Sequence, residues 1–217
     1  MHRFILEDDN NTPVDMAFDE VGDLDSVQEA LLLLIGATGS GILSTELRIQ
    51  KLGFLLAKSL QDEELDKDFD FVPYDYGPFS ENLDSAIDLL GSQGYLTKDD
   101  DRNVYRVTAE GKKIAELLAR KNTHRAQIAK DLVEYLGKLH TDDLVGVVYE
   151  LYPEYARSSV ILDRLKRRRS YDSVTVPTTS AKGEQSHIVK SRLGRKLVVK
   201  AEGDTVHIVE IIDERPK

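Results

Sequence analysis

Residues 94–108, GYLTKDDDRNVYRVT, contain two short apolar segments separated by a polar, acidic turn. Tyr95–Thr97 and Val104–Val107 carry aromatic and β-branched residues, which favour strands, and aspartate and asparagine between them favour a turn. The pattern predicts a β-hairpin. Thr108 follows the second segment and is a good N-cap residue, so we expect a helix to begin directly after the hairpin.

Helical patterns precede this hairpin. Val27–Ile35 is an almost continuous apolar run, and Ser44–Leu60 places leucines on one face with Ser44 as the expected N-cap. Between this second helix and the next we expect an acidic connection with an extended aromatic stretch. Ser80–Gln93 is predicted as a third helix that Ser80 caps and Gly94 ends.

The segments after the hairpin return to the helical period. Further helices are expected from Thr108, over Thr123–Leu139, over Thr141–Leu151 and over Ser158–Arg169. A succession of helix, β-hairpin and helix is the order of a winged helix. We therefore expect an α+β protein whose main part, residues 27–170, is a largely helical winged-helix domain, preceded by an acidic arm over residues 1–26.

The last 47 residues have a different pattern. The segments SVTVP (173–177), KLVVKA (196–201) and TVHIVEII (205–212) alternate or are β-branched, and an EGD turn separates the last two. We expect a small, basic, β-rich domain over residues 171–217. The charge reverses near the same point: residues 1–163 hold 16 Lys and Arg against 32 Asp and Glu, whereas residues 164–217 hold 13 against 7.

Composition limits the class of protein. There is no cysteine, so disulfides, thiolate metal sites and cysteine nucleophiles are excluded. The longest apolar run, Ala30–Ile35, is far shorter than the ~20 residues of a membrane span, and the N-terminal residues show no signal-peptide pattern. We expect a soluble cytoplasmic protein without a membrane partner, cofactor or metal.

One glycine-rich segment invites a nucleotide-binding interpretation. In LLLLIGATGSGILST (31–45), Gly36 and Gly41 have the spacing of a P-loop, but Ile42 and Leu43 stand where that motif needs lysine and a hydroxyl residue. Both the phosphate counter-charge and the magnesium ligand are thus missing. No catalytic serine motif or histidine–carboxylate metal pattern is found either, so we expect no enzymatic activity.

Five segments in this order carry a family resemblance: STELRIQKLGFLLAK (44–58), FVPYDYGPFS (71–80), AIDLLGSQGYL (86–96), YRVTAEGKKIAELL (105–118) and VYELYPEYARSS (148–159). Together they resemble the YwgA-type winged-helix proteins of bacteria and archaea, and more distantly the SocA-like antitoxin domain, over about residues 40–162. The resemblance implies a non-enzymatic regulatory or antitoxin-like domain that binds a partner protein. Residues 174–209 resemble AbrB-type DNA-binding domains in the order of their short motifs and strand-like segments. This resemblance implies a short helix ending at Gly194.

Charge argues against DNA reading by the predicted winged helix. Residues 62–101 hold 13 acidic residues and two basic ones, and the phosphate backbone of DNA repels such a surface. We predict instead that this face binds a basic partner protein or mimics the charge of a nucleic acid. The alternatives are that the acids are only a solvated surface and that the aromatic residues fill the core. The candidate partner-binding residues are Tyr74, Tyr76, Phe79, Glu81, Asp84 and Asp88.

A rival hypothesis is a transcription regulator that binds DNA through its basic segment and uses the winged helix to form a homodimer. The candidate nucleic-acid-binding residues are Arg164, Lys166, Arg167, Arg168, Arg169, Lys190, Arg192, Arg195 and Lys196. Arginine and lysine are the residues that bind phosphate. The alternative for the first five is that they complement a helix C-terminus and neutralise the acidic body.

Overall fold

The computed structural model describes residues 23–60, 63–168, 171–174, 185–191, 195–202 and 205–213. Within these residues the protein is α+β and mostly helical, with small antiparallel sheets. The helices are α2 (Ser26–Gly36), α3 (Glu46–Leu60), α4 (Glu63–Phe69), α5 (Glu81–Ser92), α6 (Ala109–Lys121), α7 (Thr123–Tyr135), α8 (Thr141–Leu151), the 3-10 helix η1 (Pro153–Ala156) and α9 (Leu162–Arg168). The predicted arm lies, up to residue 22, outside the described residues.

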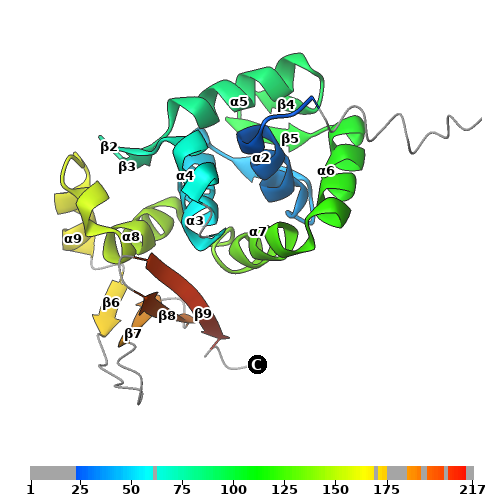
Figure 1. Ribbon diagram of the computed structural model, residues 1–217. Coiled ribbons are helices and arrows are strands. Elements are labelled where there is room, and N and C mark those ends of the chain that lie inside the picture. The colour runs from blue at the N-terminus through cyan, green and yellow to red at the C-terminus, as the bar shows by residue number, and fades with distance from the viewer. Residues whose placement is uncertain are drawn as a thin grey trace, which may run out of the picture.

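Helix α2 is the centre of the body. The apolar run predicted as a helix is buried along nearly its whole length, and α3, α5, α6 and α7 surround it (Figure 1). Asp25 caps its N-terminus by accepting hydrogen bonds from the amides of Val27 and Gln28. A helix that is apolar all round must be enclosed on every side, and this one is.

The predicted hairpin is confirmed as β4 (Leu96–Asp99) and β5 (Val104–Val107). A third strand, β1 (Ile42–Ser44), pairs with β5, so the sheet has the order β1–β5–β4. The predicted N-cap at Ser44 is wrong, because Ser44 ends β1 opposite Val104 and α3 begins only at Glu46. The Thr108 cap of α6 is confirmed, since its side chain accepts from the amide of Gly111.

The acidic connection between α3 and α5 contains helix α4, which the sequence did not predict, and a second hairpin. Its strands are β2 (Val72–Tyr74) and β3 (Gly77–Phe79), and they pair with each other alone. Ser80 then caps α5 by accepting from the amide of Leu83, as predicted. Helix α5 therefore has one hairpin immediately before it and another immediately after it.

The C-terminal β unit is confirmed as a four-stranded antiparallel sheet, β6 (Tyr171–Val174), β7 (Gln185–Ser191), β8 (Arg195–Glu202) and β9 (Thr205–Asp213), in sequential order. Where the AbrB-type similarity implied a short helix, residues 185–191 form a strand. This sheet lies beside α8 and α3, on the side of the body opposite α5 (Figure 1).

Two predicted helices are longer than the observed ones. Helix α7 ends at Tyr135 rather than Leu139, and α9 begins at Leu162 rather than Ser158. In the first case the carbonyl groups of Gly137 and Leu139 accept hydrogen bonds from the buried Arg48 guanidinium instead of continuing a helix. Among the described helices, none combines the length and apolar character that crossing a membrane requires.

Candidate protein-interaction surface

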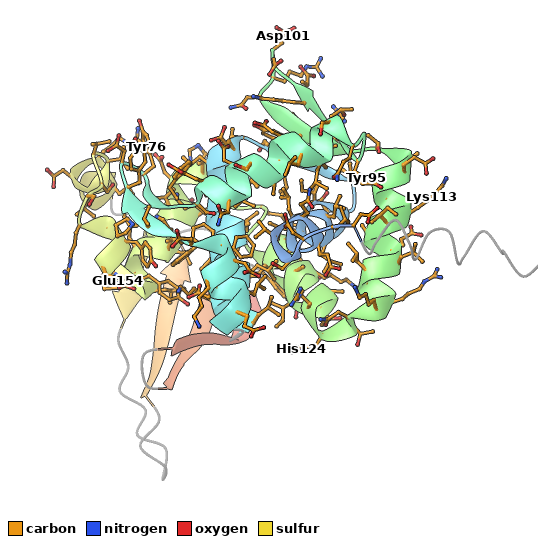
Figure 2. The ribbon with its side chains drawn as sticks, turned by 45° about the horizontal axis from the view of Figure 1, so that its top comes forward. Tyr76, Tyr95, Asp101, Lys113, His124 and Glu154 are labelled. Carbon is orange, nitrogen blue, oxygen red and sulfur yellow. The ribbon has the colours of Figure 1, made fainter. Side chains whose placement is uncertain are left out.

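The β2–β3 hairpin exposes large apolar side chains. Val72, Tyr74 and Tyr76 are 46%, 55% and 47% exposed, and Val160, which lies beside the hairpin turn, is 66% exposed. Apolar side chains of this size are normally buried, so four of them at one place make this a candidate interaction surface. We call these four residues the hairpin patch; Figure 2 labels Tyr76 at its outer edge.

Polar side chains of α3 hold the hairpin from below. Gln50 is buried and binds Ser80 twice: its Nε2 donates to the Ser80 carbonyl and its Oε1 accepts from the Ser80 amide, both at 3.0 Å. Lys51 is 2% exposed, and its Nζ donates to the Pro78 carbonyl at 2.7 Å. Burial lowers the pKa of Lys51 to about 7, because the charged amine loses its hydration.

The hairpin turn is also fixed from the side of α8 and η1. Gly77 has φ of +90°, and a Cβ there would lie 2.5 Å from Cε1 of Tyr149, so only glycine fits. The Tyr149 hydroxyl is 2.6 Å from Oγ of Ser159, and the next amide, of Val160, donates to the Asp75 carbonyl at 2.9 Å. The hairpin and the residue-160 loop therefore form one pre-organised unit.

Beneath the hairpin the aromatic residues form a core. The Phe54 ring lies edge-on to Phe71, Tyr152 and Tyr155, with ring centroids 4.7–5.2 Å apart. The tyrosines of this region thus divide: Tyr149 and Tyr152 are buried, whereas the predicted partner-binding residues Tyr74 and Tyr76 are exposed. Phe79 is half-buried and its ring packs 5.5 Å from that of Tyr74.

The predicted acidic residues lie on α5, directly after the hairpin. Glu81 and Asp88 are exposed and Asp84 is half-buried. Burial, and then the neighbouring Asp88, raise the pKa of Asp84. Burial and then Asp84 raise the pKa of Glu46, at the start of α3, so a third carboxylate faces the same place. Like charges gathered in this way repel a phosphate backbone.

The β4–β5 hairpin continues the acidic surface. Its tip carries Asp99, Asp100 and Asp101. Within the same hairpin, Lys98 forms an ion pair with Asp100, and Arg102 forms one with Asp99. In Figure 2 the tip, marked by Asp101, projects at the top of the body, and the hairpin patch, marked by Tyr76, lies at its left. The predicted partner-binding residues therefore lie on two successive elements, the β2–β3 hairpin and α5.

One of the basic candidates, Arg164, already has an ion-pair partner within the protein. The Arg164 guanidinium lies 2.7 Å from the carboxylate of Asp142, in the first turn of α8. This ion pair matches the alternative in which the arginine neutralises charge on the acidic body. Lys166, Arg167 and Arg168 lie in α9, while Arg169 and Arg192 lie outside the described residues. The backbone register pairs Lys190 of β7 with Lys196 of β8, and the next pair is Ser191 with Arg195.

Sequence reasoning missed four contributors to this surface. Val72 and Val160 belong to the hairpin patch, and Gln50 and Lys51 support it from below. A lysine at an otherwise apolar helix position was the available signal for Lys51, because buried lysines are rare. Val160 gave no signal, because it reaches the patch only through its backbone bond to Asp75.

No group of three or more histidine, aspartate or glutamate side chains suited to a metal ion occurs among the described residues. No protein-family model, curated protein or solved structure matches this chain. The function is therefore argued from the surface itself.

Proposed function

We propose that the protein is a non-enzymatic winged-helix regulator of the YwgA type, antitoxin- or adaptor-like, that binds a basic partner protein. The contact surface is the hairpin patch together with Phe79 and the acidic residues Glu81, Asp84 and Asp88. The cytoplasm is the expected compartment.

The order of elements supports the winged-helix part of the proposal. Helix α2, strand β1, helix α3, helix α5 and the β4–β5 hairpin follow one another along the chain, and the three strands form a sheet of order β1–β5–β4. In that arrangement α5 is the equivalent of a recognition helix and β4–β5 is the wing. Helix α4 and the β2–β3 hairpin are then an insertion just before α5.

One observation carries the binding proposal. Buried polar side chains, Gln50 and Lys51, hold in place a hairpin whose own large side chains face solvent. Burying the Lys51 amine costs free energy because the charged group loses its hydration. The aromatic side chains that the hairpin presents are exposed and add little to the stability of the core, so stability alone does not explain the arrangement. Rigid aromatic side chains are what interfaces use as anchors, because little conformational entropy is lost when they bind.

The charge of the surface selects the kind of partner. The position equivalent to a recognition helix carries Glu81, Asp84 and Asp88, and the wing tip carries three more aspartates. Such a surface attracts a basic protein and steers its association, whereas it repels DNA.

In-cell photo-crosslinking tests the proposal. A photoreactive phenylalanine analogue placed at Tyr76 in the full chain should give a discrete covalent adduct with one partner protein. The matched control places the same group at Lys113, an exposed position of α6 away from the patch in Figure 2. Equal adducts at both positions, or an adduct at Lys113 alone, would overturn the proposed surface.

The register of the C-terminal sheet favours a second candidate, DNA binding through residues 164–200. Lys190 and Lys196 lie directly opposite each other on neighbouring strands, and like charges in such a pair cost stability. Asp172 of β6 is opposite Lys190 on its other side, so one carboxylate is in register with two lysines. A DNA titration at ~50 and ~200 mM salt separates the candidates, since several phosphate contacts would change affinity by orders of magnitude. A full-length K190Q/R195Q/K196Q variant should lose that binding if this candidate holds.

A further inference from the structure

The backbone edges of the β2–β3 hairpin decide how a partner can be recognised. Strands with a free edge often bind a peptide as an added strand, which needs backbone donors and acceptors that face outward. In this hairpin Pro73 lies opposite Pro78, so neither member of the central pair has an N–H group. Because paired positions alternate, the amides of Val72 and Tyr74 face β3 and not the outer edge.

Carbonyl groups on both sides of the Pro73–Pro78 pair are also engaged. Along the outer edge of β2, the Phe71 carbonyl accepts from the Tyr155 hydroxyl at 3.4 Å and the Asp75 carbonyl accepts from the Val160 amide at 2.9 Å. Along the edge of β3, Pro78 accepts from Lys51 and Ser80 is bound by Gln50. The protein's own residues therefore bind the backbone at both ends of the outer edge of β2 and along β3, and the proline pair removes the central N–H groups.

The side chains remain accessible. Val72 and Tyr74 are two residues apart on one strand and so share a face, and Tyr76 follows in the turn. An exposed acid, Asp75, lies between the two tyrosines along the chain, and exposed Glu81 begins α5 directly after the hairpin and Ser80. Aromatic rings beside carboxylates suit a guanidinium group, which can stack on the ring and bind the carboxylate in one geometry.

We propose that the partner is recognised through arginine side chains stacked on Tyr74 and Tyr76, and not by addition of a strand to the hairpin. This inference rests on the proposed function and specifies the chemistry of its partner. Lysine would bind less well, because its ammonium is a strongly hydrated point charge that does not stack.

Four blocked tetrapeptides test the inference on the full chain by nuclear magnetic resonance of the tyrosine rings. They are leucine–arginine–leucine–arginine, its version with every backbone amide methylated, the same sequence with lysine for arginine, and the same with glutamate. We expect the two arginine peptides to shift the Tyr74 and Tyr76 ring signals with similar affinity. The lysine peptide should bind about threefold weaker or worse, and the glutamate peptide should not bind.

In the Y74A/Y76A variant, where the two reporter rings are gone, binding is followed by isothermal titration calorimetry and should be lost for both arginine peptides; L89A, which removes an exposed side chain of α5 elsewhere, should keep it in both measurements. Loss of binding on backbone methylation would show strand addition and overturn the inference. Equal affinity for lysine, binding that survives in Y74A/Y76A, or no binding of any peptide would overturn it as well. The proposed function fails separately, through the crosslinking result at Tyr76, so a Tyr76 adduct without arginine-peptide binding would remove this inference alone.

Discussion

The two hairpins that flank α5 are anchored in opposite ways. The β4–β5 hairpin buries its apolar residues, Leu96 and Tyr105, which are 3% and 2% exposed, and leaves a charged tip in solvent. The β2–β3 hairpin exposes its aromatic residues and is held by buried polar groups of α3. The first arrangement is what stability alone would select. The second is what the proposed binding surface needs.

The largest expected contrast is between one tyrosine of each hairpin. Y105A should destabilise the protein by about 3 kcal/mol, because a fully buried aromatic side chain leaves a cavity. Y76A should change the free energy of unfolding by less than about 0.5 kcal/mol, since its ring is half exposed. Urea unfolding of the full chain measures both. Similar losses from the two variants would mean that the hairpin patch is part of the core.

A second contrast uses two glycines on either side of Ser80. G77A should cost about 2 kcal/mol, because Gly77 has a left-handed φ and its added Cβ would collide with Tyr149. G91A, in α5 with nothing within 4 Å of the added Cβ, should stabilise by about 0.5 kcal/mol. Thermal unfolding checks the pair. A harmless G77A would show that the turn is not held against Tyr149.

The buried amine gives the β2–β3 hairpin a distinctive pH dependence. Because the folded-state pKa of Lys51 is lowered to about 7, the unfolded chain binds more protons between pH 7 and its ordinary value, and stability should rise with pH across that window. From pH 7 to 9 we expect a gain of about 1–2 kcal/mol. Burial raises the pKa of Tyr149 and Tyr155, which lowers stability again above about pH 10.

The matched variant for this experiment is K51M, which keeps the chain length without the amine. Its unfolding free energy, measured by urea titration at each pH, should stay flat from pH 7 to 9. If the unfolding free energy of K51M changed with pH as steeply as that of the wild type, the pH dependence would belong to another group and not to Lys51.

The smallest effect concerns the acidic residues between the hairpins. Burial and Asp88 raise the pKa of Asp84, so its ionised form is disfavoured in the folded protein and stability falls as the pH rises through that pKa. D84N should therefore stabilise at pH 7, by less than about 0.5 kcal/mol after solvent screening. D101N, at the exposed wing tip, is the control. The difference between the two variants should shrink in ~1 M salt.

Much of the fold could be predicted because local signals agreed. The apolar run of α2, the caps Ser80 and Thr108 and the β4–β5 hairpin each have a short-range cause, and the structure confirms them. Helix α4 was missed because its acidic sequence resembles a solvated loop. The start of α3 was misplaced because pairing of Ser44 with Val104 is a long-range contact that overrides local capping preference.

The candidate surface was predictable only in part. Tyr74 and Tyr76 stand out as aromatics in an acidic, proline-bounded segment, but Tyr149 and Tyr152 also stand among acidic residues and next to a proline, and they are buried. Whether an aromatic side chain faces the core or solvent depends on the packing of α8 and η1 against the hairpin. That packing joins residues about 80 positions apart, such as Phe71 and Tyr155, and leaves no periodic signal in the sequence.

Co-purification of the bound partner from cells, with each hairpin altered in turn, tests the central claim most directly. The wild-type chain, Y74A/Y76A and D99N/D100N/D101N would be compared at equal amounts of folded protein. We predict that the tyrosine variant keeps its unfolding free energy yet loses the partner, while the wing-tip variant retains most of it. Full recovery of the partner by Y74A/Y76A would contradict the assignment of the β2–β3 hairpin as the binding surface.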